Sequence, residues 1–338
     1  MEKKSLIIIN NEKVFKEDGQ FYCDNFDMKA TPEALNNYYS VQFIVRNSKK
    51  RGGNRLNLEN VKIGSNIFNF LLHIYKTFKI PNAKYLLVTI NPYIFFSFII
   101  LFLFRKKTYV YLQSNGYEEW KHILGSWSVW IYHLMFILIT SNSKVISCNP
   151  RLYNTKKSFL VYPSRISSDW TVNHKEPPLD KVRFVYVGRI NPEKGIYNFI
   201  NLFDKINFKA ELSIVGYKKN IKSKNENIKL LGYCSDPKSL MDIYDAHNIM
   251  ILPSFTESHP YVVDECLSRR RPIIIFKEIS YIANNKKGIF VINRSLEELT
   301  ETVNYIMKNY KKIQTDMEKN NLPTKKVFFK KFSEILDL

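Results

Sequence analysis

The sequence predicts an α/β protein of two domains, each built on a doubly wound parallel sheet. Short apolar runs alternate with longer segments of helical period along the whole chain, a pattern typical of parallel sheets covered on both faces. The length of 338 residues suits two domains of roughly 150 residues each. A polar stretch with a Pro-Pro pair, residues 163–180, interrupts the alternation and is the best candidate for a linker.

The first half alternates strand-like and helical segments. Apolar runs of strand length occur at residues 6–10, 41–45, 85–90, 108–112 and 144–147. Helical patterns separate most of them, most clearly at residues 67–78 and 120–139. We therefore expect residues 1–165 to form an N-terminal Rossmann-like domain, followed by a linker at 166–180.

The second half repeats this alternation. Its strand-like runs are residues 182–187, 211–215, 228–231, 248–252, 272–276 and 289–292, and its helical patterns are residues 193–206, 237–244, 261–269 and 296–309. We expect residues 181–322 to form a second Rossmann-like domain. Residues 323–338 contain an amphipathic pattern, which predicts a terminal helix that returns to the first domain or lies on a membrane surface.

Composition and charge narrow the classes of function. A hydrophobic fraction of 45% with 24% charged residues excludes overall disorder. The net charge of +20 favours a polyanionic partner, which would be nucleic acid, an anionic membrane surface or a phosphate-bearing substrate. A compositional drift toward lysine, with no partner, is the alternative. The excess is spread over both halves, and the clusters at residues 49–51, 105–107 and 269–271 are also compatible with solvated surface.

Cysteine spacing and apolar run length indicate a reducing compartment and no membrane span. The four cysteines are far apart and form no CxxC pair, so neither a zinc site nor a disulfide framework is indicated. The apolar segments 93–104 and 127–139 are shorter than the ~20 residues that cross a bilayer. We expect them to be buried helices, with contact at a membrane surface as the alternative. The N-terminus lacks the pattern of a signal peptide.

The first motif with a chemical meaning follows the strand-like run 182–187. Gly188 allows a tight turn, and Arg189 and Lys194 stand between the strand end and the start of a helix. Two cations beside the N–H groups of a helix N-terminus suit a diphosphate. A surface turn with solvated charges is the alternative.

The second motif follows the strand-like run 248–252. Glu257 falls in the loop and Glu265 in the helix that begins near Tyr261. A loop carboxylate can accept hydrogen bonds from sugar hydroxyls, and a helix carboxylate eight residues later can hold the two hydroxyls of a ribose. The backbone N–H groups that open the helix, at Tyr261 to Val263, point toward a phosphate. A capped surface helix with two incidental acids is the alternative.

Together the two motifs resemble those of the retaining glycosyltransferases of family GT4, which have the GT-B fold. The family shows G-R-x-x-x-x-K-G and, after Pro-Ser, E-x7-E. This chain has Gly188-Arg189 with Lys194-Gly195, and Pro253-Ser254 with Glu257 and Glu265. The resemblance covers residues 182–310 and is weak over 1–160. It implies two Rossmann-like domains facing an interdomain cleft.

The resemblance also implies a site for a nucleoside-diphosphate sugar. Arg189 and Lys194 would bind the diphosphate and stabilise the leaving group, and Glu257 would contact the donor sugar, which makes these three the catalytic set. The donor-binding set would be Gly188, Gly216, Gly232, Tyr233, Ser258, His259, Pro260, Tyr261, Val262 and Glu265. The family is generally metal-independent, and the sequence contains no D-x-D motif, so we expect neither a metal nor a cofactor.

The chain departs from the family pattern in three places. Arg270 stands where a glycine usually ends the helix, at a cost of about 1 kcal/mol if that position requires a positive φ. Residues 277–281 replace the usual Gly-Gly…Glu loop, so the role of this loop is open. His259 stands near the position of a common Gly-Phe, so it contacts the sugar or a phosphate, or is an ordinary loop histidine.

The first domain is expected to bind the acceptor through loops that follow its strands. The candidates are Asp18, Gly19, Asn91, Asn115 and Gly116, with ordinary turn residues as the alternative. The family's usual His in the last of these loops is absent.

The leading hypothesis is a cytoplasmic glycosyltransferase, peripheral on the inner face of the cytoplasmic membrane. It would act on a glycan or lipid-linked acceptor in bacterial surface polysaccharide synthesis (capsule, O-antigen or lipopolysaccharide), an extension that rests on family analogy. A nucleotide-sugar epimerase of the same fold, and a non-catalytic nucleic-acid or membrane-binding protein, are the alternatives. With the two motifs assigned to a diphosphate site, nucleic acid becomes an unfavoured partner.

Overall fold

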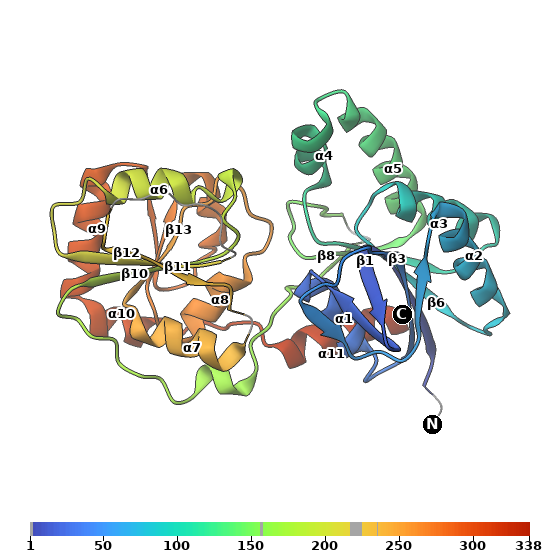
Figure 1. Cartoon of the computed structure of the whole chain (residues 1–338), viewed down its shortest axis with the longest axis horizontal. Helices are drawn as coiled ribbons and strands as arrows, with labels where there is room; N and C mark the ends of the chain where they lie inside the picture. The colour runs from blue at the N-terminus through green and yellow to red at the C-terminus, as the bar shows by residue number, and fades with distance from the viewer. Residues whose placement is uncertain (1–2, 156–157, 217–224, 235) are drawn as a thin grey trace. The chain divides into compact units, whose positions relative to one another are not determined.

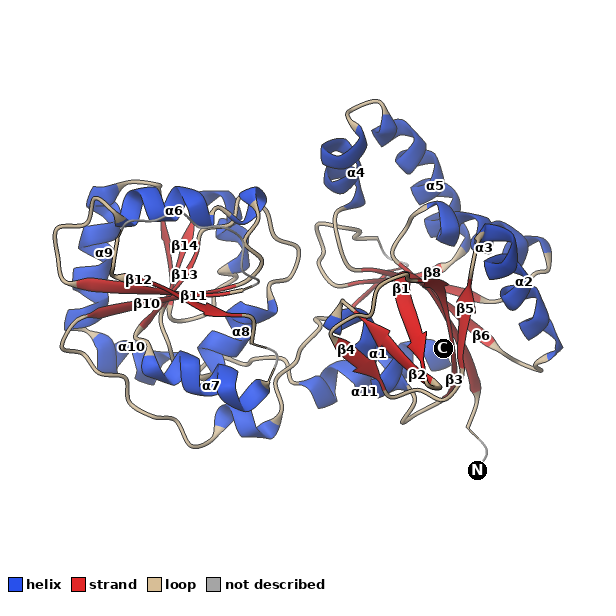
Figure 2. Cartoon of the chain, in the orientation of Figure 1, coloured by secondary structure: helices blue, strands red, loops and turns tan. Residues whose placement is uncertain are grey.

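The computed structural model describes residues 3–155, 158–216, 225–234 and 236–338. The chain divides into two compact units, Met1–Tyr162 with Val327–Leu338, and Pro163–Lys326 (Figure 1). Each unit is built on a mainly parallel sheet with helices on both faces (Figure 2). Residues 166–180, which we expected to be a linker, belong to the second unit.

The described part of the first unit contains a nine-stranded sheet. Its strands are β1 (Ser5–Glu17), β2 (Gln20–Cys23), β3 (Ser40–Asn47), β4 (Asn54–Leu56), β5 (Val61–Gly64), β6 (Lys84–Val88), β7 (Thr108–Leu112), β8 (Lys144–Ser147) and β9 (Ser158–Leu160). Strands β5-β3-β1-β6-β7-β8-β9 pair in parallel, and β2 and β4 add antiparallel pairs beyond a bulge in β1. The strand order reverses between β1 and β6, as in doubly wound folds.

Helices cover both faces of this sheet. They are α1 (Phe26–Leu35), α2 (Ile67–Lys76) with the short 3₁₀ turn η1 (Thr77–Lys79), α3 (Pro92–Leu103), α4 (Gly116–Leu124), α5 (Ser128–Asn142) and α11 (Lys325–Asp337). Helices α2, α3 and α5 lie on one side, and α1 and α11 lie on the other (Figure 1).

The prediction of one helix over residues 120–139 is wrong, because the segment forms two helices. Gly125 ends α4 with a φ of +90°, a conformation that side-chain-bearing residues rarely adopt. The Ser128 hydroxyl donates to the Gly125 carbonyl oxygen at 2.7 Å and thereby fixes the turn into α5. The apolar pattern in the sequence continues across Gly125, so periodicity alone did not reveal the break between the two helices.

Helix α11 packs against the first unit. Phe328, Phe332 and Leu336 are buried in the core beneath the sheet. The hydroxyls of Tyr39 and Tyr109 donate to carbonyl oxygens of the helix, at Ser333 and Leu336, both at 2.9 Å. The alternative in which this helix lies on a membrane surface is wrong, because its apolar face is already covered.

In its described residues, the second unit forms a sheet of six parallel strands in the order β12-β11-β10-β13-β14-β15. The strands are β10 (Val182–Val187), β11 (Ala210–Val215), β12 (Ile228–Gly232), β13 (Ile249–Leu252), β14 (Ile273–Phe276) and β15 (Ile289–Ile292). The helices are α6 (Ile196–Phe203), α7 (Pro237–Ala246), α8 (Tyr261–Ser268), α9 (Leu296–Lys308) and α10 (Tyr310–Met317), with 3₁₀ turns η2 (Ser168–Thr171), η3 (Pro192–Lys194) and η4 (Lys277–Ile282). The strand order reverses between β10 and β13, which places a ligand site at their carboxyl ends.

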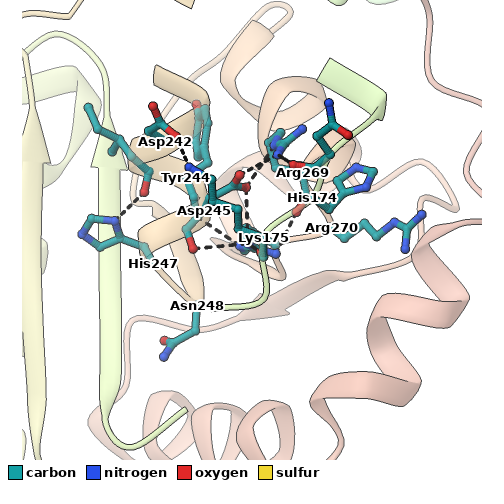
Figure 3. A network of polar contacts seen from close by, with 12 residues as sticks. His174, Lys175, Asp242, Tyr244, Asp245, His247, Asn248, Arg269 and Arg270 are labelled. Carbon is teal, nitrogen blue, oxygen red and sulfur yellow. Dashed lines mark hydrogen bonds and ion pairs between the residues drawn. The ribbon is translucent and has the colours of Figure 1, made fainter. Parts of the chain in front are cut away.

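A buried polar network ties the segment before β10 to this unit (Figure 3). The Asp245 carboxylate receives hydrogen bonds from the guanidinium groups of Arg269, at 2.5 and 3.0 Å, and Arg271, at 3.3 Å. Arg269 also donates to the carbonyl oxygens of Val172 and Asn173, at 2.8 and 3.0 Å. A solvated surface is therefore the wrong interpretation of this arginine cluster, since Arg269 and Arg271 are only 2% and 1% exposed.

Candidate functional site

The two sequence motifs occupy the loops that follow β10 and β13, at the reversal of the strand order. Gly195 has a φ of +65°, and a Cβ atom there would lie 1.9 Å from the Pro253 carbonyl oxygen. The Phe255 N–H donates to the Glu193 carbonyl oxygen at 3.0 Å. Glycine at position 195 is thus what allows the two loops to touch.

Lys194 and Glu257 meet where these loops touch. The Lys194 ammonium donates to Glu257 Oε1 at 2.6 Å, and the Ser254 hydroxyl donates to the same oxygen at 2.7 Å. Both charged side chains are largely shielded from water, with exposed fractions of 16% for Lys194 and 10% for Glu257. The loop thus presents a paired cation and anion together with the second carboxylate oxygen, Oε2, which takes part in neither bond.

Tyr281 and Arg294 fix the loop that contains Glu257 through hydrogen bonds to its backbone. The Tyr281 hydroxyl accepts from the Glu257 N–H at 3.2 Å and donates to the Glu257 carbonyl oxygen. The Arg294 guanidinium donates to the Pro253 carbonyl oxygen at 2.7 Å and lies 4.1 Å from the centre of the Phe255 ring. Sequence reasoning left the role of 277–281 open, and the structure gives Tyr281 of η4 a part in positioning Glu257.

Three glycines converge where β10, β11 and β12 end. The Gly188 N–H donates to the Val215 carbonyl oxygen at 3.0 Å, and the Gly216 N–H donates to the Gly232 carbonyl oxygen at 2.9 Å. A Cβ atom at Gly216 would lie 2.3 Å from the Gly188 carbonyl oxygen, and Gly232 has a φ of +80°. The positions of Gly216 and Gly232 therefore favour glycine. Tyr233, which follows, is exposed.

Arg189 lies at the same edge of the sheet as Lys194. Its side chain is exposed, while its carbonyl oxygen accepts from the buried Tyr186 hydroxyl at 2.6 Å. Among the described residues, the edge therefore carries an exposed cation, Arg189, as well as Lys194, which is paired to a carboxylate. A cationic edge at the carboxyl ends of parallel strands is suited to an anionic ligand.

Glu265 is buried in the first turns of α8. Its Oε2 accepts from the Tyr244 hydroxyl at 3.2 Å, and its Oε1 lies 3.9 Å from the Arg165 guanidinium. Arg165 also lies 4.6 Å from the centre of the Tyr261 ring. Sequence reasoning missed Arg165 and Tyr244, because neither belongs to the motif and only the fold brings them to Glu265.

His259 and Asp264 form a second polar group at the start of α8. His259 Nε2 lies 3.5 Å from Asp264 Oδ2, and the Lys286 ammonium donates to Asp264 Oδ1 at 2.5 Å. Burial raises the pKa of Asp264, but the nearby His259 and Lys286 outweigh it and hold that pKa below its usual range. His259 therefore contacts a neighbouring side chain in the protein itself.

The remaining donor candidates lie in the loop and first turn around His259. Ser258 is half-buried, Pro260 directly precedes α8, and Val262 is half-buried in its first turn. The Val263 N–H already donates to the Pro260 carbonyl oxygen at 3.1 Å. The start of α8 thus has fewer N–H groups available for a phosphate than the sequence predicts.

In the first unit, Asp18 and Gly19 form a tight turn. β1 ends at Glu17, β2 begins at Gln20, and both turn residues have positive φ, +49° and +74°. This is the two-residue turn that matches the twist of a hairpin. The structure therefore gives these two acceptor candidates a structural role.

The other acceptor candidates begin helices at the strand ends of this unit. The Asn91 side chain caps α3 by accepting from the Ile94 N–H at 3.2 Å, and Asn115 precedes α4. A Cβ atom at Gly116 would clash with the Tyr132 ring, at 2.2 Å. The structure brings a further cation to this sheet edge, since Arg46 at the end of β3 lies 4.3 Å from the Tyr93 ring centre.

The fold and site define a class of protein. Two units with doubly wound parallel sheets constitute the GT-B fold, and similar solved structures have it along their whole length. Sucrose-phosphate synthase from Thermosynechococcus elongatus aligns over 99% of this chain and 98% of its own, with a TM-score of 0.69 and 12% identity. Anabaena HepE, solved with UDP and glucose, aligns over 99% of both chains with a TM-score of 0.69 and 12% identity. At 12% identity, the similarity to these structures shows the fold alone.

The lipopolysaccharide outer core galactosyltransferase WaaB, in its apo form, aligns over 98% of this chain and 99% of its own, with a TM-score of 0.66 and 12% identity. Residues 170–322 match the family described as Glycosyl transferases group 1. The match spans most of the second unit and includes both motifs. No curated protein matches the sequence.

Proposed function

We propose that this protein is a retaining glycosyltransferase that takes its sugar from a nucleoside diphosphate. The observation that carries the proposal is the Lys194–Glu257 pair, which lies beside Arg189 at the strand-order reversal of a unit that matches glycosyl transferases group 1. A paired cation and anion at this edge suit a ligand that is itself part anion and part polyol.

Each half of the site has a proposed task. Arg189 and Lys194 bind the donor diphosphate and stabilise the charge that grows on it as the bond to the sugar breaks, which makes the reaction metal-independent. Glu257 Oε2 accepts hydrogen bonds from sugar hydroxyls, since Oε1 already serves Lys194 and Ser254. No enzyme nucleophile is assigned. The acceptor hydroxyl oxygen attacks the sugar carbon on the face that the diphosphate leaves, and its proton passes to the departing diphosphate oxygen.

The nucleoside is proposed to bind further along the same edge. Glu265 holds the ribose hydroxyls, and Gly216, Gly232 and Tyr233 lie against the nucleoside. Ser258, His259, Pro260, Tyr261 and Val262 line the path between the ribose and the sugar. The tight packing at Gly216, where a Cβ atom would lie 2.3 Å from the Gly188 carbonyl oxygen, supports this placement. Glycine leaves the backbone at these strand ends without side chains, so a ligand can approach it closely.

The acceptor is proposed to be a glycan, free or lipid-linked, in the synthesis of bacterial surface polysaccharide. The likeness to WaaB, described as a lipopolysaccharide outer core galactosyltransferase, supports this role. Asn91, Asn115 and Gly116 are the candidate contacts of the first unit. The proposed location is the cytoplasm, at the inner face of the cytoplasmic membrane.

A panel of nucleotide sugars tests the proposal. UDP-, GDP-, ADP- and CMP-sugars are added singly, with and without EDTA, and thermal unfolding and slow donor hydrolysis are measured. We expect one nucleotide class to raise the unfolding temperature and to be hydrolysed, with no effect of EDTA. Arg189→Ala is expected to abolish both signals, while Lys205→Ala, an exposed lysine after α6, retains them.

The outcomes separate the alternatives. Silence across the whole panel contradicts the transferase, and conversion of a donor into an epimer instead of free sugar and nucleotide identifies an epimerase. Tight, salt-sensitive binding of DNA or RNA without any response to nucleotides would support the non-catalytic alternative.

A further inference from the structure

One face of the first unit exposes apolar side chains where a soluble protein usually has polar ones. Helices α2, α3 and α5 lie together on one side of the sheet (Figure 1). Their inward side chains, including Phe70, Ile94 and Ile139, fill the core. A helix that covers a sheet in this way usually carries polar residues on its outer side.

The outer side of these helices is apolar as well. The exposed residues include Phe68 on α2, Phe102 and Leu103 on α3, and Trp130, Leu134 and Leu138 on α5. Phe68 is 82% exposed and Trp130 is 60% exposed. We call the exposed side of α2, α3 and α5 the helix face. An apolar patch that runs over three helices marks a surface that binds something.

The same region is almost free of acidic residues. Between residues 60 and 168 the chain has 13 Lys and Arg but only two acids, Glu118 and Glu119. Helices α2, α3 and α5 contain no Asp or Glu at all. A ligand of this surface must therefore be apolar in part and carry negative charge.

Cations and apolar side chains meet at one corner of the helix face, where α2 and α3 end. The Phe104 ring centre lies 5.8 Å from that of Tyr75 and 4.9 Å from that of Phe78. Lys106 lies over the Phe78 ring at 4.9 Å, and Arg105 is exposed. A shallow hollow at this corner is lined by Phe102, Leu103, Arg105, Lys106, Thr108 and Asn142.

This combination distinguishes an anionic lipid surface from a second copy of the chain. A two-fold contact between two such faces would set the cations of one copy against those of the other, which opposes association. A bilayer of anionic phospholipids offers phosphates to the cations and a headgroup region into which Trp and Phe insert. Within the described parts of the chain, no helix combines the length and apolar character that crossing a bilayer requires.

We propose that the helix face docks on the surface of an anionic phospholipid bilayer. Trp130, Leu134 and Phe102 enter the headgroup region, and Arg105 and Lys106, which line the hollow at the corner, contact lipid phosphates. The inference rests on this face alone and does not depend on the sugar-transfer site. It deepens the proposed location at a membrane by naming the residues that make the contact.

Sedimentation with lipid vesicles tests the proposal on the full chain. One set of vesicles is phosphatidylcholine alone, and the other is phosphatidylcholine mixed with phosphatidylglycerol. We expect sedimentation with the mixed vesicles at low salt, and much less with the neutral vesicles or at high salt. Absence of sedimentation with the mixed vesicles at low salt would overturn the proposal.

Matched variants locate the contact. The double variant Arg105→Gln with Lys106→Gln is expected to weaken partition onto mixed vesicles about tenfold or more. Lys311→Gln with Lys312→Gln removes two exposed cations from α10 in the second unit and is expected to leave partition unchanged. Equal losses in both double variants would show a non-specific charge effect and would contradict the docking face.

Variants of the exposed apolar residues test the docking face independently of the charge variants. Trp130→Ser with Leu134→Ser is expected to reduce vesicle binding about tenfold, with an unchanged circular dichroism spectrum because both side chains are exposed. Tyr305→Ser, at an exposed position of α9, is the control. Unchanged vesicle binding by the Trp130 and Leu134 variant would contradict the proposal. A dimer formed by the unchanged protein but not by this variant would also contradict it, since the face would then bind a second copy of the chain. Donor hydrolysis by these variants is expected to equal that of the unchanged protein, so failure of either proposal leaves the other measurable.

Discussion

Lys194 and Glu257, 63 residues apart in the chain, form an ion pair of 2.6 Å at the point where two strand-end loops touch. The pair is largely shielded from solvent, and the Ser254 hydroxyl shares the carboxylate oxygen that Lys194 contacts. A ligand diphosphate at this edge would compete with Glu257 for Lys194. The pair is therefore expected to hold the lysine in place before the donor arrives.

Lys194→Met is expected to lower kcat/KM for the donor at least 100-fold, since it removes a cation that we propose stabilises the leaving group. Glu257→Gln keeps a similar shape and is expected to lower kcat more than it weakens nucleotide binding. Steady-state kinetics and nucleotide titrations check both, with Lys205→Ala as the control. If Lys194→Met retained turnover within a few-fold of the unchanged protein, Lys194 would have no part in the reaction.

Tyr281→Phe tests whether the Tyr281 hydroxyl, which bonds to both the N–H and the carbonyl oxygen of Glu257, positions that residue. The variant loses two hydrogen bonds to the Glu257 backbone, and a stability loss of about 1–2 kcal/mol is expected. We expect kcat to fall about tenfold while nucleotide binding is retained, because the proposed partner of Glu257 is the sugar and not the nucleotide. Tyr305→Phe, at an exposed position, is the matched control. A loss of stability without any change in kcat would make Tyr281 purely structural.

Much of the second unit could be predicted from the sequence, because each of its motifs directly follows an apolar run. Gly188 to Gly195 and Glu257 to Glu265 lie at strand ends in any parallel sheet, so their place at the sheet edge followed from the alternation of strands and helices. Tyr281, Arg294 and Arg165 could not be found in this way. Each contacts the site through the tertiary fold, with no fixed spacing from the motif that it supports.

The adjacent arginines 269–271 show where sequence reasoning ends. A run of three like charges predicts solvated surface, yet Arg269 and Arg271 are buried around Asp245, while Arg270 is 37% exposed and lies 2.7 Å from Glu318. Only the fold shows that the carbonyl oxygens of Val172 and Asn173 point toward Arg269 and accept its hydrogen bonds. In the first unit, Asp18 and Gly19 carry a recognisable hairpin signal, and the structure agrees with the alternative that we gave for these two acceptor candidates, ordinary turn residues.

Asp245→Asn is expected to destabilise the second unit by about 3 kcal/mol or more, because it leaves two buried guanidinium groups without their carboxylate. Asp242→Asn, one turn earlier in α7, is a close control. Asp242 pairs with Lys175 at 2.6 Å (Figure 3), but both side chains are exposed, so a much smaller loss of stability is expected than for Asp245→Asn. Urea unfolding measures the stability of both variants. Similar losses in the two variants would contradict the structural role of the buried network.

Arg270→Gly is expected to stabilise the protein relative to Arg270→Ala by about 1 kcal/mol. Arg270 has a φ of +55°, in the region that favours glycine, so the sequence-based expectation of strain at this position applies. Both variants lose the surface ion pair with Glu318, so their difference isolates the backbone effect. Thermal unfolding of the two variants measures it. Equal unfolding temperatures would show that the positive φ carries no strain.

The unfolding free energy of the second unit is expected to fall as the pH drops below about 6.5. Burial lowers the pKa of His247, whose Nδ1–H donates to the Ile243 carbonyl oxygen at 2.6 Å. Between that lowered pKa and the ordinary value of about 6.5, the unfolded chain binds a proton that the folded unit does not, so stability is complete above about pH 6.5 and is lost toward lower pH. The slope is at most ~1.4 kcal/mol per pH unit for this residue. Burial also lowers the pKa of His174, which adds a loss in the same direction.

His247→Gln keeps an N–H donor for the Ile243 carbonyl oxygen but does not titrate, so it is expected to flatten the pH dependence. His133→Gln, at an exposed position of α5 in the first unit, is expected to leave it unchanged. Urea unfolding between about pH 7 and about pH 5 measures the slopes. If the His247→Gln slope equalled that of the unchanged protein, the loss of stability in acid would come from other groups. Asp264 is one such group, but its pKa is held below the usual value, so the loss that it causes begins only below about pH 4.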